Sequence, residues 1–309
     1  MPFPAEKKFP MRVKIGHGRY STVYAGAESG KVSAYKEVRV SLCDSPAANA
    51  SLKAALRELL ALRTIGHHDN IVHLSSYAIE RGSVVFSLQY CEWDLDKLLH
   101  HCDSNIPLEV VNDMTHQIFT GLSVIHEVGL CHRDIKPSNI LISKWSGLIK
   151  IADFGLARPM GSLSSENQAT REVCTRWYKA IEVLLGGDQS NGAMDVWSAG
   201  LVVAELLNHS PLFPGISDIN QVFLIFQSLG EPDLADWPEY SFLPDSRKLP
   251  FAGNFLSWKN LVPRASGNFA KILSGCMRYN PKKRLTAKEC LGLEISSKPF
   301  LVVDWLSTI

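Results

Sequence analysis

The feature that most constrains this chain is the eight-residue segment His-Arg-Asp-Ile-Lys-Pro-Ser-Asn at positions 132–139. Nineteen residues after its aspartate comes the tripeptide Asp153-Phe154-Gly155. Short apolar runs surround both segments, which predicts that each is a turn between strands. A charged turn by itself is a simple alternative for the first segment. The same turn followed by a further strand and a second acidic turn is not expected by chance.

Length and composition are those of an ordinary globular protein. The 309 residues suffice for one two-lobed domain or for two small ones. A hydrophobic content of 46% with 20% charged residues is typical of such proteins. The formal net charge is only +1 and no long basic run occurs. The charge pattern therefore does not indicate binding to nucleic acid or to a membrane surface.

Three features of the sequence bear on the compartment. The first eight residues contain no apolar core, which argues against a signal peptide. No uncharged apolar run reaches the roughly 18 residues that a membrane-spanning helix needs. The seven cysteines are scattered without a C-x-x-C spacing, as is typical of free thiols in a reducing compartment. We therefore expect a soluble cytosolic or nuclear protein.

The first part of the chain is predicted to form strands. Residues 13–24 and 32–38 show alternating apolar positions around a glycine turn, which predicts a hairpin followed by a third strand. Gly16 and Gly18 lie in a G-x-G-x-x-S sequence, where the backbone can approach a phosphate closely. This sequence lacks a third glycine, and by itself a simple turn is an equally good interpretation.

A helix is predicted next. Residues 41–50 are rich in turn formers and are predicted to be a loop, whereas apolar residues from Leu52 to Leu62 recur at helical spacing. Glu58 lies among these apolar residues and needs a cation, for which Lys36 is available. The alternative is a solvent-facing Glu58 that pairs with a neighbour on its own helix.

The remaining periodicity is consistent with a small sheet followed by helices. Residues 71–74 and 84–88 are predicted to be two more strands, and residues 108–127 a helix with one apolar face. The histidines at 67–68 and the His-His-Cys run at 100–102 are poor metal-site candidates, because adjacent side chains on a helix point apart.

Together these segments resemble the protein kinases. The segment 132–139 matches H-R-D-x-K-x-x-N, Asp153-Phe154-Gly155 matches D-F-G, and Lys36 follows an alanine by two residues, as in the kinase A-x-K motif. Residues 195–200 match D-x-W-S-x-G, whose aspartate (Asp195) tethers the catalytic-loop backbone in that family.

A narrower resemblance is to the cyclin-dependent protein kinases. Residues 170–182 are similar to their T-x-E-V-V-T-x-W-Y-R-A-P-E segment, with departures at Cys174, Lys179 and Ile181. The family pairs the last glutamate, here Glu182, with an arginine at the position of Arg284. Within the family the chain is most similar to the cell-cycle-related kinase branch, and the resemblance extends from residue 11 to about residue 300.

This resemblance implies an α+β, bilobal protein kinase fold, with a small β-rich N-lobe carrying one main helix and a larger α-helical C-lobe. It places the N-lobe at residues 1–88, the hinge at 89–93 and the C-lobe at 94–309. The two lobes form one catalytic domain over residues 9–300.

The implied reaction is transfer of the γ-phosphate of ATP, bound with Mg²⁺, to a serine or threonine of a protein. Such a transfer requires little covalent chemistry from the protein. By resemblance, Asp134 accepts the hydroxyl proton, Lys136 lies near the transferred phosphate and favours Ser/Thr over Tyr acceptors, and Asn139 and Asp153 bind the metal. The implied catalytic set is Lys36, Asp134, Lys136, Asn139 and Thr175.

The resemblance also implies a nucleotide-binding set. Lys36 would hold the α and β phosphates, Val23 would cover the base, Leu88 would close the back of the pocket, Cys91 would offer its backbone to the base, and Asp94 would reach the ribose. The full set is Ile15, Gly16, Gly18, Val23, Ala34, Lys36, Glu58, Leu88, Gln89, Cys91, Asp94, Leu141 and Asp153.

Regulation is implied at two hydroxyl side chains. Thr170 corresponds to the activating threonine of the family, whose phosphate would be held by Arg57, Arg133 and Arg158. The alternative is that each arginine pairs with a local carboxylate. Tyr20 corresponds to an inhibitory site in the glycine loop, but a tyrosine that simply packs on the hairpin explains it equally well.

The implied partners are protein substrates with proline after the acceptor, an upstream activating kinase and a cyclin-like activator on the helix that carries Glu58. Leu52 and Lys53 depart from the family motif there, so a different cyclin-like protein, or none, stays open. The branch suggests an association with the cilium. Two other classes are alternatives: a catalytically weak pseudokinase or scaffold, and a small-molecule kinase, against which the match at 170–182 and the long segment 231–262 argue.

Overall fold

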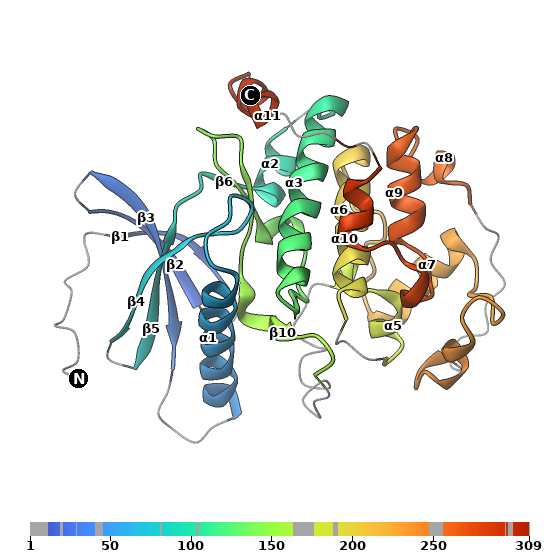
Figure 1. Cartoon of the computed structure of the whole chain (residues 1–309), viewed down its shortest axis with the longest axis horizontal. Helices are drawn as coiled ribbons and strands as arrows, with labels where there is room; N and C mark the ends of the chain where they lie inside the picture. The colour runs from blue at the N-terminus through green and yellow to red at the C-terminus, as the bar shows by residue number, and fades with distance from the viewer. Residues whose placement is uncertain are drawn as a thin grey trace.

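The structure is a computed structural model that describes residues 12–18, 21–28, 30–40, 46–80, 82–102, 105–162, 176–187, 191–246, 256–293, 295 and 299–308. It has two lobes of different composition (Figure 1). The smaller lobe contains a β-sheet and one long helix, and the larger lobe is mainly helical. The predicted α+β, bilobal architecture is therefore confirmed.

The small lobe is built on a five-stranded antiparallel sheet with the order β1-β2-β3-β5-β4. It contains the predicted hairpin at 13–24 and the predicted strands at 32–38 and 84–88. The bounds of the five strands are β1 Arg12–His17, β2 Ser21–Glu28, β3 Lys31–Arg39, β4 Leu74–Glu80 and β5 Ser83–Gln89. In the register, Val23 lies opposite Lys36 and Ala34 opposite Leu88. These four side chains consequently point from the same face of the sheet.

Helix α1, Pro46–Ile65, lies beside the sheet (Figure 1). The predicted loop over 41–50 is wrong for its second half, because the helix begins at Pro46. Proline is well tolerated in the first turn of a helix, and the alanines that follow are strong helix formers. Proline, asparagine and serine are also typical of turns, so the residue types of this segment do not distinguish a loop from the start of a helix.

The connection from α1 to β4 lies against the large lobe. The predicted strand over 71–74 is wrong, since Ile71 forms only an isolated bridge to Ile151 and β4 begins at Leu74. The Asn70 side-chain amide donates to Gln117 Oε1 and to the Ile149 carbonyl, both at 3.0 Å. The apolar run at 71–72 is therefore buried between the lobes and not within the sheet.

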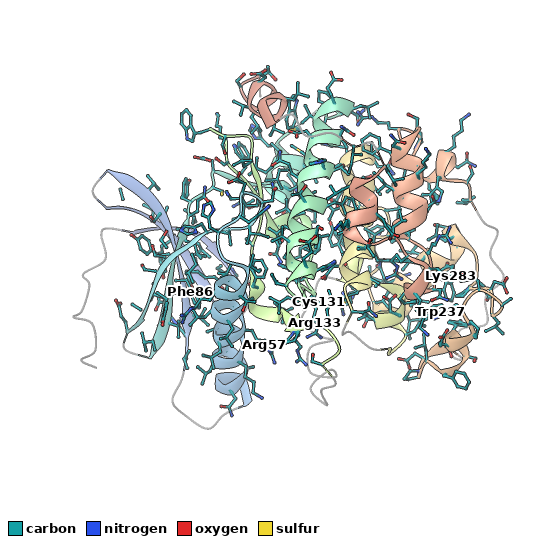
Figure 2. All side chains as sticks on the ribbon, viewed as in Figure 1. Arg57, Phe86, Cys131, Arg133, Trp237 and Lys283 are labelled. Atoms are coloured by element: carbon teal, nitrogen blue, oxygen red, sulfur yellow. The ribbon has the colours of Figure 1, made fainter. Side chains whose placement is uncertain are left out.

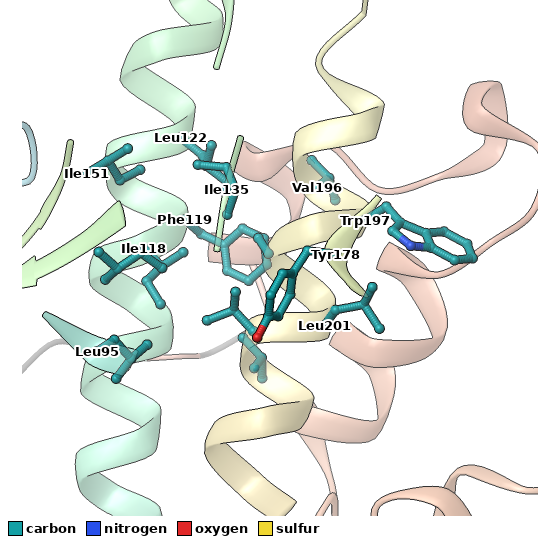
Figure 3. Packing of buried hydrophobic residues seen from close by; sticks show 14 of the residues in the cluster. Leu95, Ile118, Phe119, Leu122, Ile135, Ile151, Tyr178, Val196, Trp197 and Leu201 are labelled. Carbon is teal, nitrogen blue, oxygen red and sulfur yellow. The ribbon is translucent and has the colours of Figure 1, made fainter. Parts of the chain in front are cut away.

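The large lobe is organised around α3 (Leu108–Glu127), which confirms the predicted helix, and α6 (Ala193–Asn208). Figure 3 shows Phe119 of α3 beside Tyr178, between α3 and α6. Further helices surround this pair: α2 Leu95–His101, α5 Ile181–Leu184, α7 Asp218–Leu229, α8 Trp258–Leu261, α9 Asn268–Cys276, α10 Ala287–Leu291 and α11 Pro299–Leu306.

Two small sheets lie between the central helices and the small lobe. One has the order β6-β8-β9, with β6 Trp93–Asp94, β8 Ile140–Ile142 and β9 Ile149–Ile151. The other pairs β7 Leu130–Cys131 with β10 Arg158–Pro159. Short 3₁₀ helices complete the chain: η1 Pro137–Asn139, η2 Phe154–Leu156, η3 Arg176–Tyr178, η4 Pro238–Phe242 and η6 Pro281–Lys283.

Two further expectations can be compared with the structure. Within the described residues, every helix is too short or too polar to cross a bilayer. The cysteines in the described part of the chain carry free thiols, as predicted: Cys91, Cys102, Cys131, Cys276 and Cys290.

Candidate functional site

The segment 132–139 forms a turn between β7 and β8, and its polar side chains converge on one carboxylate. Lys136 Nζ lies 2.8 Å from Asp134 Oδ2. Asn139 Nδ2 donates to the same oxygen at 2.9 Å and to the Asp134 carbonyl at 2.8 Å. Burial raises the pKa of Asp134, whereas Lys136 acts to lower it. The turn thus presents an aspartate whose basicity is increased and whose orientation is set by two donors.

Asp195, in the first turn of α6, holds the backbone of this turn. Its side chain is 1% exposed. It accepts from His132 N at 2.8 Å and from Arg133 N at 2.7 Å. Arg133 has a φ of 71°, in the left-handed region that non-glycine residues rarely adopt. A strained backbone conformation of this kind persists only when surrounding contacts stabilise it. Here the Asp195 carboxylate provides those contacts.

His132 connects this turn with the turn at 153–155. Its Nδ1 accepts from Asp134 N at 3.2 Å, so Nε2 carries the proton and donates to the Ala152 carbonyl at 3.0 Å. Its ring also packs edge-on against Phe154, with centroids 4.9 Å apart. Asp153 itself has a φ of 66°, a second left-handed residue at the site. The two acidic turns therefore form one hydrogen-bonded unit.

Lys36 of β3 joins the two lobes. Its Nζ lies 2.8 and 2.7 Å from the two Glu58 carboxylate oxygens and 2.7 Å from Asp153 Oδ1. The Glu58 side chain is 2% exposed. The predicted contact between Glu58 and Lys36 is confirmed, and the solvent-facing alternative for Glu58 is wrong. One cation thus fixes α1, the sheet and the 153–155 turn relative to one another.

The electrostatics of this triad follow from burial and charge. Burial acts to lower the pKa of Lys36, but the two carboxylates outweigh it and the pKa is raised. Burial raises the pKa of Glu58. Burial would also raise the pKa of Asp153, yet Lys36 lowers it to about 2. Asp153 is therefore ionised at neutral pH, and since 47% of its side chain is exposed, it can still accept a further ligand.

The sheet places a group of apolar residues beside Lys36. Val23 and Ala34 share its face of the sheet, together with Leu88, as the register above shows. Ile15 lies on β1 and is 36% exposed. The pairing register of β1 with β2 shifts between Lys14 and Gly16. Gly18 N donates to the Ser21 carbonyl at 2.8 Å, which connects the ends of β1 and β2. The register thus places Val23, Ala34 and Leu88 beside Lys36, whereas the roles predicted for these residues in nucleotide binding stay predictions.

The segment that connects the lobes follows β5. Gln89 N donates to the His73 carbonyl at 2.9 Å, and Cys91 is partly buried, with burial raising the pKa of its thiol to about 12. Leu141 of β8 lies opposite Asp94 of β6. Asp94 has a role that the sequence did not indicate. Its side chain accepts from Lys97 N at 2.8 Å and caps α2.

The three predicted regulatory arginines lie on different elements. Figure 2 labels Arg57 on α1 and Arg133 on the large-lobe side. Arg158 lies opposite Cys131 in the β7–β10 ladder, and Cys131 precedes Arg133 by two residues. Arg133 and Arg158 are both buried, at 6% and 8% exposure. One of these buried arginines thus lies in the turn at 132–139 and the other on β10, whose partner strand β7 leads into that turn.

Three predicted residues lie outside the described part of the chain: Tyr20, Thr170 and Thr175. After these residues, the described chain begins again at η3, which packs against α6. Glu182 forms the predicted pair with Arg284, with contacts of 2.9 and 3.0 Å.

Two contacts were not predicted. Tyr178 OH donates to Glu205 Oε2 at 2.6 Å, and burial raises the pKa of Glu205 to about 7. His126 contacts Asp195. Both pairs are far apart in the chain, and no local sequence signal identifies them.

The residues present suit a nucleotide with a divalent metal. Asn139 uses its amide nitrogen for Asp134, which leaves its amide oxygen as a ligand. The partly exposed Asp153 carboxylate offers a second oxygen, and hard cations prefer such oxygen ligands. Among the described residues, no cluster of three His, Cys, Asp or Glu side chains could hold a metal.

One comparison with known proteins bears on this site. A family model described as the protein kinase domain matches residues 9–294, which is most of the 309-residue chain. The matched range includes both acidic turns, Lys36, Glu58 and Asp195.

Proposed function

The chain belongs to the protein kinase family and has its bilobal fold, and from this premise we propose that it is an ATP-dependent serine/threonine kinase of the cyclin-dependent-kinase-like type. The observation that carries the proposal is the position of Lys36, within 2.8 Å of both Glu58 and Asp153. The lysine can hold phosphates only when α1 and the 153–155 turn are both in place. The completeness of this set supports an active enzyme over a pseudokinase.

Each residue then has a distinct task. Asp134 orients the acceptor hydroxyl and takes its proton, for which its raised pKa is favourable. Lys136, 2.8 Å from Asp134, is placed to contact both this carboxylate and the transferred phosphate. Asn139 and Asp153 would hold the metal, for which we propose Mg²⁺. The bound metal would neutralise charge on the phosphates.

The acceptor class can be tested with peptides that each differ from a Ser-Pro peptide at one position. We expect transfer to the Ser-Pro and Thr-Pro peptides, weaker transfer to the Ser-Ala peptide, and none to the Tyr-Pro peptide. Proline suits a site where a backbone N–H would have no partner. Lys179 replaces the arginine of the family at this site, and its Nζ lies 4.0 Å from Asp218 Oδ2. Because of this replacement, we expect only a modest preference for proline. Equal transfer to the proline and alanine peptides would contradict the proline-directed part of the proposal.

We propose two activating inputs. The first is phosphorylation of Thr170, because a phosphate would supply up to two negative charges that could pair with Arg57, Arg133 and Arg158. The second is a cyclin-like partner on α1, whose outer face carries exposed Leu52, Leu56 and Leu60, the last at 63%. These leucines recur every fourth residue, which makes a continuous apolar stripe suited to an apolar protein surface.

Both inputs can be tested on the purified chain. We expect low activity from the chain alone, an increase of about tenfold or more after treatment with an activating kinase, and no increase for Thr170→Ala. Mass spectrometry verifies that Thr170 is modified in the wild type. Full activity of the untreated chain alone would contradict both inputs. Equal activation of Thr170→Ala and wild type would contradict the phosphate clamp only.

A further inference from the structure

Two free thiols of the large lobe lie in direct contact. Cys276 is the last residue of α9 and Cys290 lies in α10, two helices of the large lobe (Figure 1). Their sulfur atoms are 3.6 Å apart, and both residues are 0% exposed. We propose that this pair is a modification site for hydrogen peroxide, at which the two thiols form a disulfide that links α9 to α10. The inference goes beyond the proposed phosphate transfer and does not depend on it.

The backbones that carry the two sulfurs are held by contacts of their own. Leu285 N donates to the Gly275 carbonyl at 3.1 Å, which joins the segment before α10 to the end of α9. A capping box over residues 286–289 fixes the start of α10. Helix α6 packs on the other side of Cys276, because a Cβ added to Gly200 would lie 2.7 Å from the Cys276 Cβ. The contact between the sulfurs therefore follows from the packing of three helices.

The separation of the sulfurs suits a disulfide. Bonded sulfur atoms lie about 2.05 Å apart. The two thiols begin at 3.6 Å, with nothing between them, so rotation of the side chains can supply most of the remaining approach. A disulfide formed in this way needs little movement of the helices.

The charges near the pair indicate which sulfur reacts first. The attacking species is the thiolate. Burial raises the pKa of the Cys276 thiol, whereas the positive charge of Arg284 acts to lower it. Arg284 thus stabilises a thiolate at Cys276, and we assign the first attack to this sulfur.

The reaction has two steps. The Cys276 thiol gives up its proton and its sulfur attacks one peroxide oxygen; the O–O bond breaks, the released hydroxide takes the proton to leave as water, and Cys276 becomes a sulfenic acid. The Cys290 sulfur then attacks the Cys276 sulfur. The S–S bond forms, the S–O bond breaks, and a second water leaves with the Cys290 proton. Together the two thiols lose two electrons, and one peroxide is reduced to two waters.

Burial determines which oxidant can reach the pair. Because neither side chain is exposed, the oxidant must enter during a local opening of the lobe. Hydrogen peroxide is small and uncharged, whereas oxidised glutathione is large and anionic. We therefore expect the disulfide to form much faster with hydrogen peroxide than with oxidised glutathione.

The disulfide would close a loop that contains Arg284. The two cysteines are 14 residues apart in the chain, and Arg284, which lies between them, contacts both Glu182 oxygens. A cross-link of this span stabilises a fold mainly by restricting the unfolded chain. We expect the melting temperature of the oxidised chain to rise by about 5 °C.

The test treats the folded full chain with hydrogen peroxide, blocks the remaining thiols and maps the peptides without reductant by mass spectrometry. We expect one linked peptide pair that carries Cys276 and Cys290. The number of thiols titrated in denaturant should fall by two from the seven of the chain. The melting temperature should rise, and dithiothreitol should reverse all three changes.

Three variants complete the test. Cys276→Ala and Cys290→Ala should lose both the linked pair and the rise in melting temperature, whereas Cys102→Ala, which removes another buried thiol, should keep both. The peptide map of the wild type decides the case even where a variant does not fold.

Three results would count against the proposal. Absence of the linked pair from the folded wild type would overturn it, as would a pair that forms only in the denatured chain. Equal rates with hydrogen peroxide and oxidised glutathione would overturn the assignment of peroxide as the oxidant.

Discussion

Replacing Asp134 by asparagine is expected to lower kcat by about a hundredfold to ten-thousandfold, the range that a general base contributes. The substitution is nearly isosteric, and the asparagine oxygen can still accept from Lys136 and Asn139, which now donate at 2.8 and 2.9 Å. Its other terminal atom becomes an NH₂ group. A donor then faces the acceptor hydroxyl where a proton acceptor is needed, so the turn is preserved while the chemistry is lost.

The measurement separates chemistry from folding and binding. The variant should bind ATP with Mg²⁺ and melt like the wild type, and single-turnover transfer to the Ser-Pro peptide should show the whole loss. Asp304→Asn, on the exposed side of α11, is the matched control for removing one carboxylate and should keep full activity. An Asp134→Asn enzyme with wild-type kcat would exclude Asp134 as the base.

Replacing Arg284 by alanine is expected to destabilise the fold by about 3–5 kcal/mol, as is typical when one partner of a buried ion pair is removed. Arg284 contacts both Glu182 oxygens and donates to the Ala193 carbonyl at 2.8 Å. The two side chains are only 0% and 4% exposed. The variant leaves a buried carboxylate without its cation, and it also removes the guanidinium stacked 4.9 Å from the Trp197 ring.

A neighbouring ion pair provides the control. Lys282 Nζ lies 2.6 Å from Glu239 Oε1, but these side chains are 78% and 49% exposed. Solvent screens such a pair, so Lys282→Ala should have a stability close to that of the wild type. Urea denaturation, followed by fluorescence for both variants, measures the difference. If the two substitutions had equal effects, the Arg284 pair would not stabilise the fold in the way its burial indicates.

The local sequence was enough to predict much of the site. Alternating apolar residues place Ala34 and Lys36 on one face of a strand whatever the rest of the chain does. A glutamate within an apolar helical stripe cannot be buried without a cation. This requirement by itself predicts the contact between Glu58 and Lys36. The motifs at 132–139 and 153–155 likewise identify residue types whose chemistry is defined by their functional groups.

Tertiary packing decided what no local pattern encodes. The start of α1 at Pro46 and the burial of Ile71 between the lobes both contradicted predictions made from neighbouring residues alone. His126 and Asp195 are 69 residues apart, and their contact exists only because the end of α3 packs on the start of α6. Periodicity determines which side chains share a face of an element, whereas a contact between elements depends on how the whole chain packs. The left-handed backbone of Arg133 is a result of that packing, since the buried carboxylate of Asp195 stabilises it.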